Sequence, residues 1–273
     1  MERMLQDRVA IITGSGRGIG RAAALLFARE GARVVVSDLD SAPAEETAQE
    51  IKAAGGQCIV VPGDVTEGAF AERIVKKAVE VWGGLHVLVN NAGYTWDAVV
   101  HKMTDEQWEA MLAVHLTAPF RLIRAAAPYF RDAAKAEKEA GKVVNRKIIN
   151  ISSMAGTRGN AGQANYSSAK AGIVGLTKTL AKEWGGFNVQ VNAVAYGWID
   201  TRLTKEKEAG ETLERAGKAV AIGVPAVMRN IMQQVIPAGR PGTVEEAAGP
   251  LLFFASPLSD YVSGQCLEVT GGW

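Results

Sequence analysis

A glycine-rich turn near the start of the chain is the feature that most restricts its fold. The apolar run RVAIIT leads into GSGRGIG, an apolar helical pattern follows, and a second apolar run over 33–37 ends in Asp38. This succession of strand, glycine turn, helix and strand is the context in which a glycine pattern marks a dinucleotide site. Gly14, Gly18 and Gly20 allow the backbone to approach a pyrophosphate at a helix N-terminus, where unpaired N–H groups favour anions. The pattern therefore predicts a nucleotide-binding α/β fold.

The residues around the turn also bear on which dinucleotide binds. The acidic side chain at the end of the second apolar run, Asp38, can accept hydrogen bonds from both hydroxyls of the adenosine ribose, and it would repel a 2′-phosphate. Arg17 acts in the opposite sense, because a cation in the turn could meet that phosphate. We predict NAD as the cofactor because the acidic strand end is the discriminating feature, and NADP stays possible.

Apolar segments with strand character recur along the whole chain, with helical segments between most of them. They lie near 8–13, 33–37, 57–62, 85–90, 146–152, 188–194 and 265–269. Strands that alternate with helices predict a parallel sheet covered on both faces. No linker or internal repeat divides residues 1–273, so we expect one domain. The first five strands are followed, at the edge where such sheets bind ligands, by Gly14, Asp38, Asp64, Asn91 and Ser153.

Tyr166 and Lys170 lie four residues apart in a stretch without proline whose apolar residues recur at helical spacing. Positions i and i+4 share one face of a helix, so the Lys170 ammonium should lie beside the Tyr166 phenol and lower its pKa. Such a phenol can give or take a proton near neutral pH. Ser153 can donate a hydrogen bond to the same reacting oxygen. Taken alone, Tyr166 and Lys170 could be a chance pair on a solvated helix face, and Ser153 could simply cap the local backbone. The glycine turn elsewhere in the chain favours a catalytic role for all three.

Together these motifs resemble those of the short-chain dehydrogenase/reductase family over the whole chain. TGSGRGIG matches the cofactor turn of the family, NNAG its second hallmark, and Asp64 with Val65 its adenine-side pair. The segments around Tyr166 and the later GRPGTVEEAAGPLLFFAS are most similar to the 3-oxoacyl-[acyl-carrier-protein] reductases. The resemblance implies a single Rossmann-type, doubly wound parallel sheet with strand order 3-2-1-4-5-6-7 and helices on both faces.

The resemblance also implies which residues contact the cofactor and which react. The cofactor residues are Gly14, Ser15, Arg17, Gly18, Ile19, Gly20, Asp38, Asp64, Val65, Asn91, Ala92, Gly93, Tyr166, Lys170, Gly197, Ile199 and Thr201. Ser153, Tyr166 and Lys170 match the catalytic residues of the family. Hydride transfer between the nicotinamide and a carbonyl carbon is the cofactor's own chemistry, and Tyr166 handles the proton.

We expect reversible, NAD(P)H-dependent reduction of a 3-oxoacyl thioester, carried by acyl carrier protein or coenzyme A, to the 3-hydroxyacyl thioester. A hydroxysteroid, polyol or other secondary-alcohol dehydrogenase of the same family would use the same residues. A cofactor-binding scaffold with little catalysis is a further alternative, suggested by His115 and Tyr196, where the chain departs from the family pattern. From the family we expect a homotetramer or homodimer, with helices at about 104–131 and 163–184 against a partner.

His115 stands where most relatives have an asparagine, the fourth member of their catalytic set. In the family this asparagine helps to hold a helix kink whose free carbonyl binds a water leading to the lysine. Pro119 has no N–H for the His115 carbonyl and crowds it, so we predict that the relay survives. His115 could also carry protons itself, or be a packed core histidine. Tyr196 replaces a usual proline before Gly197 and could line the pocket.

Residues 204–237 match none of the expected sheet elements, and in the family this region is a mobile lid over the substrate. Its apolar, methionine-bearing segments suit an acyl chain, although such stripes more often belong to a core. Lys142, Arg146 and Lys147 could dock an acidic carrier protein, or form a solvated helix end. The acyl-carrier reductases often carry a basic residue where this chain has Phe187, which favours coenzyme A thioesters.

Composition and charge argue against several other classes of function. The net charge is +1 with mixed signs, which gives no field for nucleic acid or a membrane surface. No apolar run has the length of a membrane span and no secretion signal is evident, so we expect a cytoplasmic protein. The histidines have no ligand spacing, so we expect no catalytic metal. Cys58 and Cys266 fall in strands at opposite edges of the family's sheet, too far apart for a disulfide.

Overall fold

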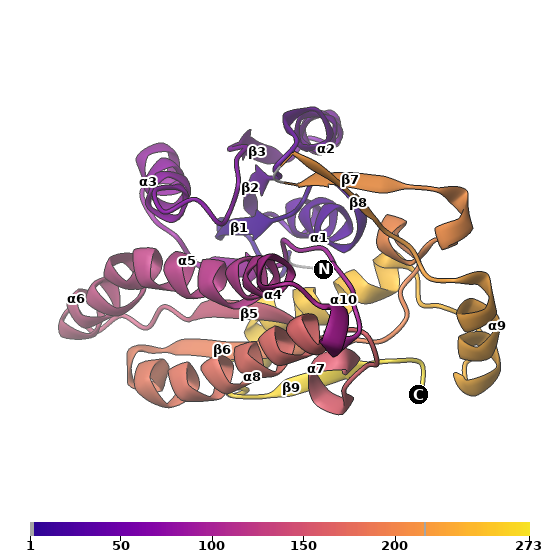
Figure 1. The fold of residues 1–273 in the computed structure, drawn as a ribbon. Helices are drawn as coiled ribbons and strands as arrows, with labels where there is room; N and C mark the ends of the chain where they lie inside the picture. The colour runs from indigo at the N-terminus through magenta and orange to yellow at the C-terminus, as the bar shows by residue number, and fades with distance from the viewer. Residues whose placement is uncertain (1–2, 216) are drawn as a thin grey trace.

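The computed structural model describes residues 3–215 and 217–273. Within these residues, seven strands form a parallel sheet in the order β3-β2-β1-β4-β5-β6-β9 (Figure 1). The strands are β1 (Val9–Thr13), β2 (Arg33–Ser37), β3 (Gln57–Val60), β4 (Val87–Asn90), β5 (Arg146–Ser153), β6 (Val189–Tyr196) and β9 (Cys266–Val269). The predicted doubly wound sheet and its order are confirmed, with β9 as the last strand of the sheet. Cys58 and Cys266 are free thiols in the two edge strands.

Helices cover both faces of the sheet. They are α1 (Gly18–Arg29), α2 (Ser41–Ala53), α3 (Phe70–Trp82), α4 (Asp105–Leu112), α5 (Ala118–Ala127), α6 (Ala133–Glu139), α7 (Met154–Arg158), α8 (Ala164–Trp184), α9 (Ala226–Val235) and α10 (Val244–Ala255). In β1, Ala10 and Ile12 belong to the core under α1, α2 and α10, whereas Val9 and Ile11 belong to the core under α3, α5 and α8. Successive strand residues point to opposite faces, so one continuous apolar strand supplies both cores.

The helix expected over 104–131 is a succession of α-helical and π-helical segments, and it continues to Glu139. Two π-helical turns, η2 (Ala113–Thr117) and η3 (Pro128–Asp132), lie on either side of α5. At the end of η2 the Ala118 N–H donates to the carbonyl of Ala113, five residues back. Pro119 has no N–H with which to continue the ordinary ladder, which is a physical reason for the wider turn just before it.

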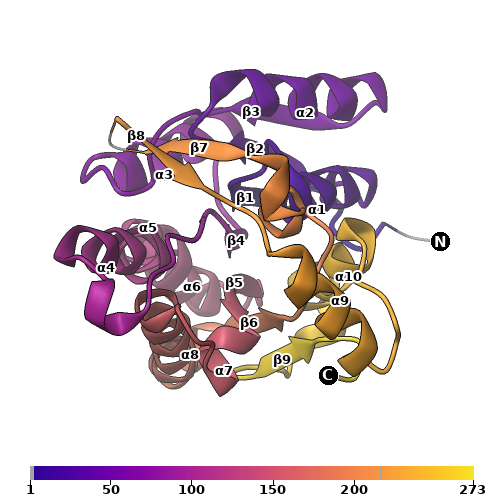
Figure 2. The ribbon, with the colours of Figure 1, turned by 45° about the vertical axis from the view of Figure 1, so that its right-hand side comes forward.

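Residues 204–237 contain more regular structure than the sequence suggested. The strands β7 (Thr212–Arg215) and β8 (Lys218–Ala221) form a separate antiparallel hairpin, and α9 follows. Figure 2 shows this hairpin and α9 outside the layers of the main sheet. The ammonium of Lys218 forms an ion pair with Glu106 on α4, so the hairpin contacts the helical layer that holds α4.

Candidate active site

The glycine turn between β1 and α1 depends on backbone geometry that other residues rarely adopt. Gly14 and Gly18 have φ values of 64° and 56°, in the left-handed region. A Cβ on Gly20 would lie 2.2 Å from the Gly14 carbonyl oxygen, so α1 starts too close to β1 for a side chain. The Asn91 side chain donates to the carbonyls of Thr13 and Gly14, at 2.9 and 3.0 Å. The turn is therefore braced from the end of β4.

Asp38 directly follows β2 and lies against this turn. Its Oδ2 accepts a hydrogen bond from the Gly16 N–H at 3.0 Å. Ser15 is buried, and its hydroxyl donates to the backbone of β1 at 2.7 Å. The Arg17 guanidinium is paired with the exposed Asp40 carboxylate at 2.8 Å. Of the two opposing charges noted in the sequence, the carboxylate of Asp38 faces the turn and the guanidinium is balanced by another acid.

The loops after β3 and β4 carry the next predicted cofactor residues. Asp64 accepts hydrogen bonds from the N–H and the hydroxyl of Thr66, at 2.8 and 2.7 Å, so its carboxylate also orders its own loop. Val65 is buried. The Ala92 N–H donates to a side chain of β1 at 3.1 Å, and Gly93 follows at an exposed position. These loops bring the residues to the sheet edge that also holds the glycine turn.

The loop after β6 closes onto the nucleotide turn. A Cβ on Gly18 would lie 3.8 Å from the Thr201 methyl group, so the two segments are neighbours. Ile199 is buried, and a Cβ on Gly197 would meet other atoms at 3.1 Å. Ile19 packs against the core below α1. The structure thus brings the predicted carboxamide-side residues next to the predicted phosphate-side residues.

Ser153, Tyr166 and Lys170 come together at the end of β5, whose last residue is Ser153. Tyr166 and Lys170 lie one turn apart on α8, with the Lys170 Nζ 5.6 Å from the centre of the Tyr166 ring. This Nζ donates to the Ile151 carbonyl at 2.7 Å, which holds the ammonium against the sheet. The Ser153 hydroxyl caps α7 by accepting from the Ala155 N–H at 3.2 Å, and it also hydrogen-bonds to the phenol. A capping role and a site role for Ser153 are therefore compatible.

Burial controls the titration of this group. It raises the pKa of Tyr166 to about 12; the hydrogen bond with Ser153 lowers this pKa and the charge of Asp97 raises it. Burial also lowers the pKa of Lys170 to about 7. The expected lowering of the tyrosine pKa by Lys170 is not seen, because desolvation of the phenol dominates. Tyr166 is accordingly a protonated phenol at neutral pH, while Lys170 titrates near neutrality.

His115 is buried in η2, beside these residues. Its Nε2 is 2.7 Å from the carbonyl oxygen of Tyr94, and its ring meets the ring of Tyr166 edge-on. Burial, reinforced by the positive charge of Lys170, lowers the pKa of His115 well below its usual value. This lowered pKa disfavours the imidazolium form through which a histidine proton shuttle would pass. A proton-carrying role of His115 stays a prediction.

Tyr196 does not line the pocket, so that expectation is wrong. Only 5% of this residue is exposed, and its hydroxyl donates to the Ala247 carbonyl on α10 at 2.5 Å. The phenol belongs to the core between the sheet and α10, where burial raises its pKa. Because its hydroxyl hydrogen-bonds to α10, Tyr196 ties β6 to that helix. This departure from the family pattern therefore has a structural role.

Both interpretations of Lys142, Arg146 and Lys147, a docking surface and a solvated helix end, are wrong for two of these three residues. Arg146 and Lys147 are buried at the start of β5 and form ion pairs with Glu137 and Asp260, both at 2.7 Å. Charged groups this deep need such partners, because an unpaired buried charge is strongly unfavourable. Lys142 alone is exposed. The cluster therefore anchors the edge of the fold and offers little surface for a partner.

Thr13, Asp97 and Gln163 contribute to the site but were missed in the sequence. The Thr13 hydroxyl accepts from the N–H groups of Asn91 and Ala92, at 3.0 and 3.1 Å, and so joins the ends of β1 and β4. Asp97 accepts from the Gln163 side chain at 2.9 Å, which ties the loop after β4 to the start of α8. The position of Thr13 just before the glycine turn was an available signal. Nothing local marks the other pair, which is 66 residues apart.

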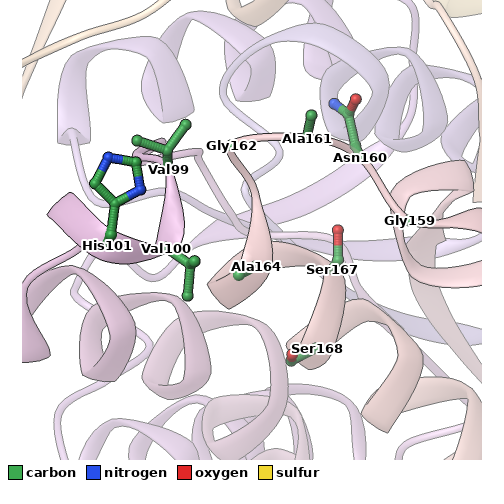
Figure 3. A pocket seen from close by; sticks show the side chains of 10 residues that line it. All are labelled: Val99, Val100, His101, Gly159, Asn160, Ala161, Gly162, Ala164, Ser167 and Ser168. Atoms are coloured by element: carbon green, nitrogen blue, oxygen red, sulfur yellow. The ribbon is translucent and has the colours of Figure 1, made fainter.

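Two cavities adjoin the site. One of about 170 Å³ lies between the loop after β4 and the hairpin, with Asp97 and Lys207 among its lining residues. The other, of about 530 Å³, lies between η1 (Val100–Lys102) and the start of α8, and Figure 3 shows His101 and Ser167 among its walls. The smaller cavity places polar groups of the hairpin region opposite the loop that follows the NNAG segment.

The rest of the described structure offers little for two other classes of site. Across residues 3–215 and 217–273, no group of three or more His, Cys, Asp or Glu side chains is arranged to hold a metal ion. In the same residues, no helical segment combines the length and the hydropathy that crossing a bilayer requires.

A parallel sheet with a glycine turn after β1, an acid after β2 and a Ser–Tyr–Lys group at the end of β5 defines an oxidoreductase that uses a nicotinamide dinucleotide. Residues 8–212 match the family model described as short chain dehydrogenase. The chain belongs to the short-chain dehydrogenase family, and its reaction is an oxidation or reduction at a CH–OH or C=O group.

The curated relatives include two that match nearly the whole chain and one that matches 70% of it. The 3-oxoacyl-[acyl-carrier-protein] reductase FabG of Thermotoga maritima is 37% identical over 268 residues, which covers 98% of each chain. The protein of the same name from Escherichia coli is 37% identical over 270 residues, 98% of this chain and 97% of its own. The hydroxyacyl-CoA dehydrogenase ChsB1 of Mycobacterium tuberculosis is 46% identical over 195 residues, 70% of this chain and 61% of its own.

Proposed function

We propose that the protein interconverts a 3-oxoacyl thioester and the corresponding 3-hydroxyacyl thioester with NAD(H). The observation that carries this proposal is the meeting of Ser153, Tyr166 and Lys170 at the end of β5, on the sheet edge that also holds the glycine turn. Relatives that cover nearly all of the chain are named 3-oxoacyl-[acyl-carrier-protein] reductases, which supports the substrate class.

In the reductive direction, the side chains protonate and stabilise the carbonyl oxygen of the substrate. Tyr166 donates its phenol proton as negative charge develops on that oxygen. Ser153 donates a hydrogen bond to the same oxygen. Lys170, held by the Ile151 carbonyl, places positive charge beside the phenolate that remains. The nicotinamide, when bound, supplies the hydride in this direction and accepts it in the other.

The nucleotide turn fits a dinucleotide and supports NAD as the preferred form. The segment from Gly14 to Gly20 has no space for added side chains at these two residues, which leaves backbone N–H groups to meet a pyrophosphate. The Asp38 carboxylate lies against the turn, where it suits two ribose hydroxyls and opposes a 2′-phosphate. The ion pair with Asp40 already balances the charge of Arg17, which weakens the case for a phosphate there.

Coenzyme A is the acyl carrier that we favour. Arg146 and Lys147 are buried in ion pairs and cannot dock an acidic carrier protein. Phe187 lies under the cations of Arg131 and Lys135, at 5.0 and 5.8 Å from the ring centre, so an aromatic ring engages these charges. The relative from Mycobacterium tuberculosis, 46% identical over 195 residues, is named a hydroxyacyl-CoA dehydrogenase. These observations support a coenzyme A thioester over a carrier-bound one.

Measuring the absorbance of the reduced nicotinamide with acetoacetyl-CoA tests the proposal. With acetoacetyl-CoA as the substrate, we expect kcat/KM with NADH to exceed kcat/KM with NADPH by roughly tenfold or more. With NADH as the cofactor, we expect kcat/KM for acetoacetyl-CoA to exceed that for the acetoacetyl carrier protein by a similar factor. A panel of steroids and polyols, oxidised with NAD, is the matched comparison. Turnover of those alcohols without turnover of the thioester would reject the proposal. Inactivity on every substrate would favour a cofactor-binding scaffold.

The same proposal includes a lid, a location and an assembly. Residues 204–237 would cover the substrate within the single domain, and the cavity between the hairpin and Asp97 supports this placement. We also place the protein in the cytoplasm as a homotetramer or homodimer. The assembly is expected from the family, in which the helices that correspond to residues 104–131 and 163–184 pack against a partner. Light scattering on the eluting protein tests the assembly, and a monomer at micromolar concentration would reject it.

A further inference from the structure

His115 lies in contact with two parts of the site at once. A Cβ on Gly93 would lie only 2.2 Å from its Cε1, so the imidazole presses directly against the backbone of the NNAG segment. The same ring meets the Tyr166 ring with centroids 4.9 Å apart and planes at 87°, an edge-to-face contact. Only 3% of His115 is exposed. The ring therefore has one well-defined position, directly against the proposed proton donor.

The hydrogen bond to Tyr94 determines the tautomer of this ring. A carbonyl oxygen can only accept, so Nε2 of His115 carries the hydrogen. Nδ1 is then a bare acceptor, and it has no hydrogen-bond partner among the residues that the structure describes.

Resting on the proposed function, we infer that His115 is a positioning residue: its neutral ring, locked by the Tyr94 carbonyl, sets the orientation of the Tyr166 phenol toward the substrate oxygen. Lys170 is the charged group near both rings, and a second cation beside it would be repelled. A neutral imidazole with its hydrogen on Nε2 carries no second positive charge, and its hydrogen bond to the Tyr94 carbonyl still fixes the ring. Turnover depends on this orientation because proton transfer requires hydrogen-bond geometry between the phenol and the reacting oxygen.

Two substitutions separate positioning from proton transfer. His115→Phe keeps an aromatic edge toward Tyr166 without any nitrogen, and His115→Leu keeps bulk alone. With NADH and acetoacetyl-CoA, we expect the Leu variant to lose roughly ten- to a hundredfold in kcat, with KM within about threefold. The Phe variant keeps the ring against Tyr166 but loses the hydrogen bond to Tyr94, so we expect a smaller loss in kcat than for the Leu variant, roughly three- to tenfold. The profile of kcat against pH for the Phe variant should keep the wild-type shape.

Wild-type kcat in the Leu variant would overturn the inference. Loss of one limb of the pH profile in the Phe variant would also overturn it, because the imidazole would then be a proton carrier. If the Leu variant does not fold, His115→Met, which also lacks a ring and is flexible enough to fill the same space, takes its place.

Crystal structures of the wild type and the ring-less variant give a readout that needs no turnover. We expect the Tyr166 hydroxyl to move by about an ångström when the ring is removed. An unmoved hydroxyl would reject positioning, whatever the substrate of the protein is. Inactivity of the wild type on thioesters, together with a displaced hydroxyl, would reject the proposed function and retain the positioning role.

Discussion

The nucleotide turn (residues 14–20) and the lid (residues 204–237) lie at the same end of the sheet, but they are held in different ways. In the turn, Gly20 leaves no space for a side chain, and Asn91 ties the ends of two strands together. In the lid, every residue of α9 is at least partly exposed, and Val227 is 70% exposed. Among the described residues of the lid, Val220, Ile222 and Ile236 are buried, and surface pairs such as that of Lys218 contribute little to stability.

This difference separates two requirements of the proposed reaction. The dinucleotide is the same in every turnover, so a preformed turn binds it without losing free energy to reorganisation. The acyl group varies in length, and a cover with few buried contacts can open and repack at low cost. We therefore expect substitutions in and below the turn to have large effects and substitutions in the lid to have small ones.

The largest effect should come from Tyr166→Phe, which removes the proposed proton donor. Loss of the proton donor should lower kcat/KM by roughly a thousandfold, because general acid catalysis contributes about 10²–10⁴. NADH affinity, measured by fluorescence, should change little. Tyr261→Phe, at a fully exposed tyrosine, is the control and should match the wild type. A Tyr166→Phe protein that kept most of its turnover would contradict the proposed mechanism.

Gly20→Ala tests the rigidity of the turn directly. The added Cβ would clash with the Gly14 carbonyl, so we expect NADH affinity to fall by roughly a hundredfold and stability by about 1–3 kcal/mol. Gly175→Ala is the matched control, because a Cβ there meets nothing within 4 Å on α8. That control should gain about 0.5–1 kcal/mol in a denaturant titration. Equal behaviour of the two variants would remove the claim that the turn is rigid.

Lys170→Met should exchange activity for stability. In the folded protein the pKa of Lys170 is lowered to about 7, below its ordinary value of 10.5, so the unfolded chain binds more protons between these two pH values. Wild-type stability contributed by this group therefore rises with pH across that window, and its full cost is present below pH 7. The Met variant should be more stable at pH 6 by roughly 1–3 kcal/mol, with the gap closing toward pH 10.

The same variant should lose most of its turnover, since it lacks the ammonium beside Tyr166. Lys178→Met, at an exposed position on the same helix, is the control for the loss of one charge. Melting temperatures collected from pH 6 to pH 10 provide the measurement. A gap between Lys170→Met and the wild type that does not vary with pH would show that the buried ammonium is not the cause.

Asp38→Asn should relax the choice of cofactor with a smaller effect. Removal of the carboxylate charge beside the ribose should improve the ratio of NADPH to NADH use by roughly tenfold. Asp40→Asn is the matched control, because it removes a neighbouring charge and frees Arg17 without changing the residue that faces the turn. Initial rates with both cofactors decide the outcome. A larger shift in the control would assign cofactor choice to Arg17.

The smallest effect should come from the lid. Ile231 on α9 is 45% exposed, so Ile231→Ser should change the free energy of unfolding by less than about 0.5 kcal/mol. We expect KM for a long-chain 3-oxoacyl-CoA to rise by roughly two- to fivefold, with KM for acetoacetyl-CoA unchanged. Equal effects on short and long substrates would show that α9 does not contact the acyl chain.

The features that the sequence predicted well are encoded over short distances. The nucleotide turn is a run of seven residues from Gly14 to Gly20, and Tyr166 and Lys170 lie within one helical turn. The strand order followed from a family resemblance carried by such local motifs. Their convergence at one sheet edge follows from the parallel topology, in which the carboxyl ends of the strands meet.

Pairs that form across the fold were not predictable in the same way. Lys147 reads as a surface base in its local context, and its partner Asp260 is 113 residues away. For Tyr196, a position in the pocket was predicted. The acceptor of its hydroxyl, the Ala247 carbonyl, belongs to a helix 51 residues further along the chain, and the local sequence gives no sign of it. The effect of burial on the titration of Tyr166 also required the packed structure, because desolvation depends on neighbours from several elements.

Between α4 and α5 the backbone holds one residue more than an uninterrupted helix would. Each helical residue rotates the direction of its side chain by about 100° around the axis, so this insertion turns α5 relative to α4. That rotation lets α4 pack against α8 while α5 packs against α3. Deleting any single residue from 113–117 would therefore swing one of these two faces away from its neighbour. A chain shortened by one residue here would lose one of these helix contacts, and the His115 imidazole would lose its position beside Tyr166.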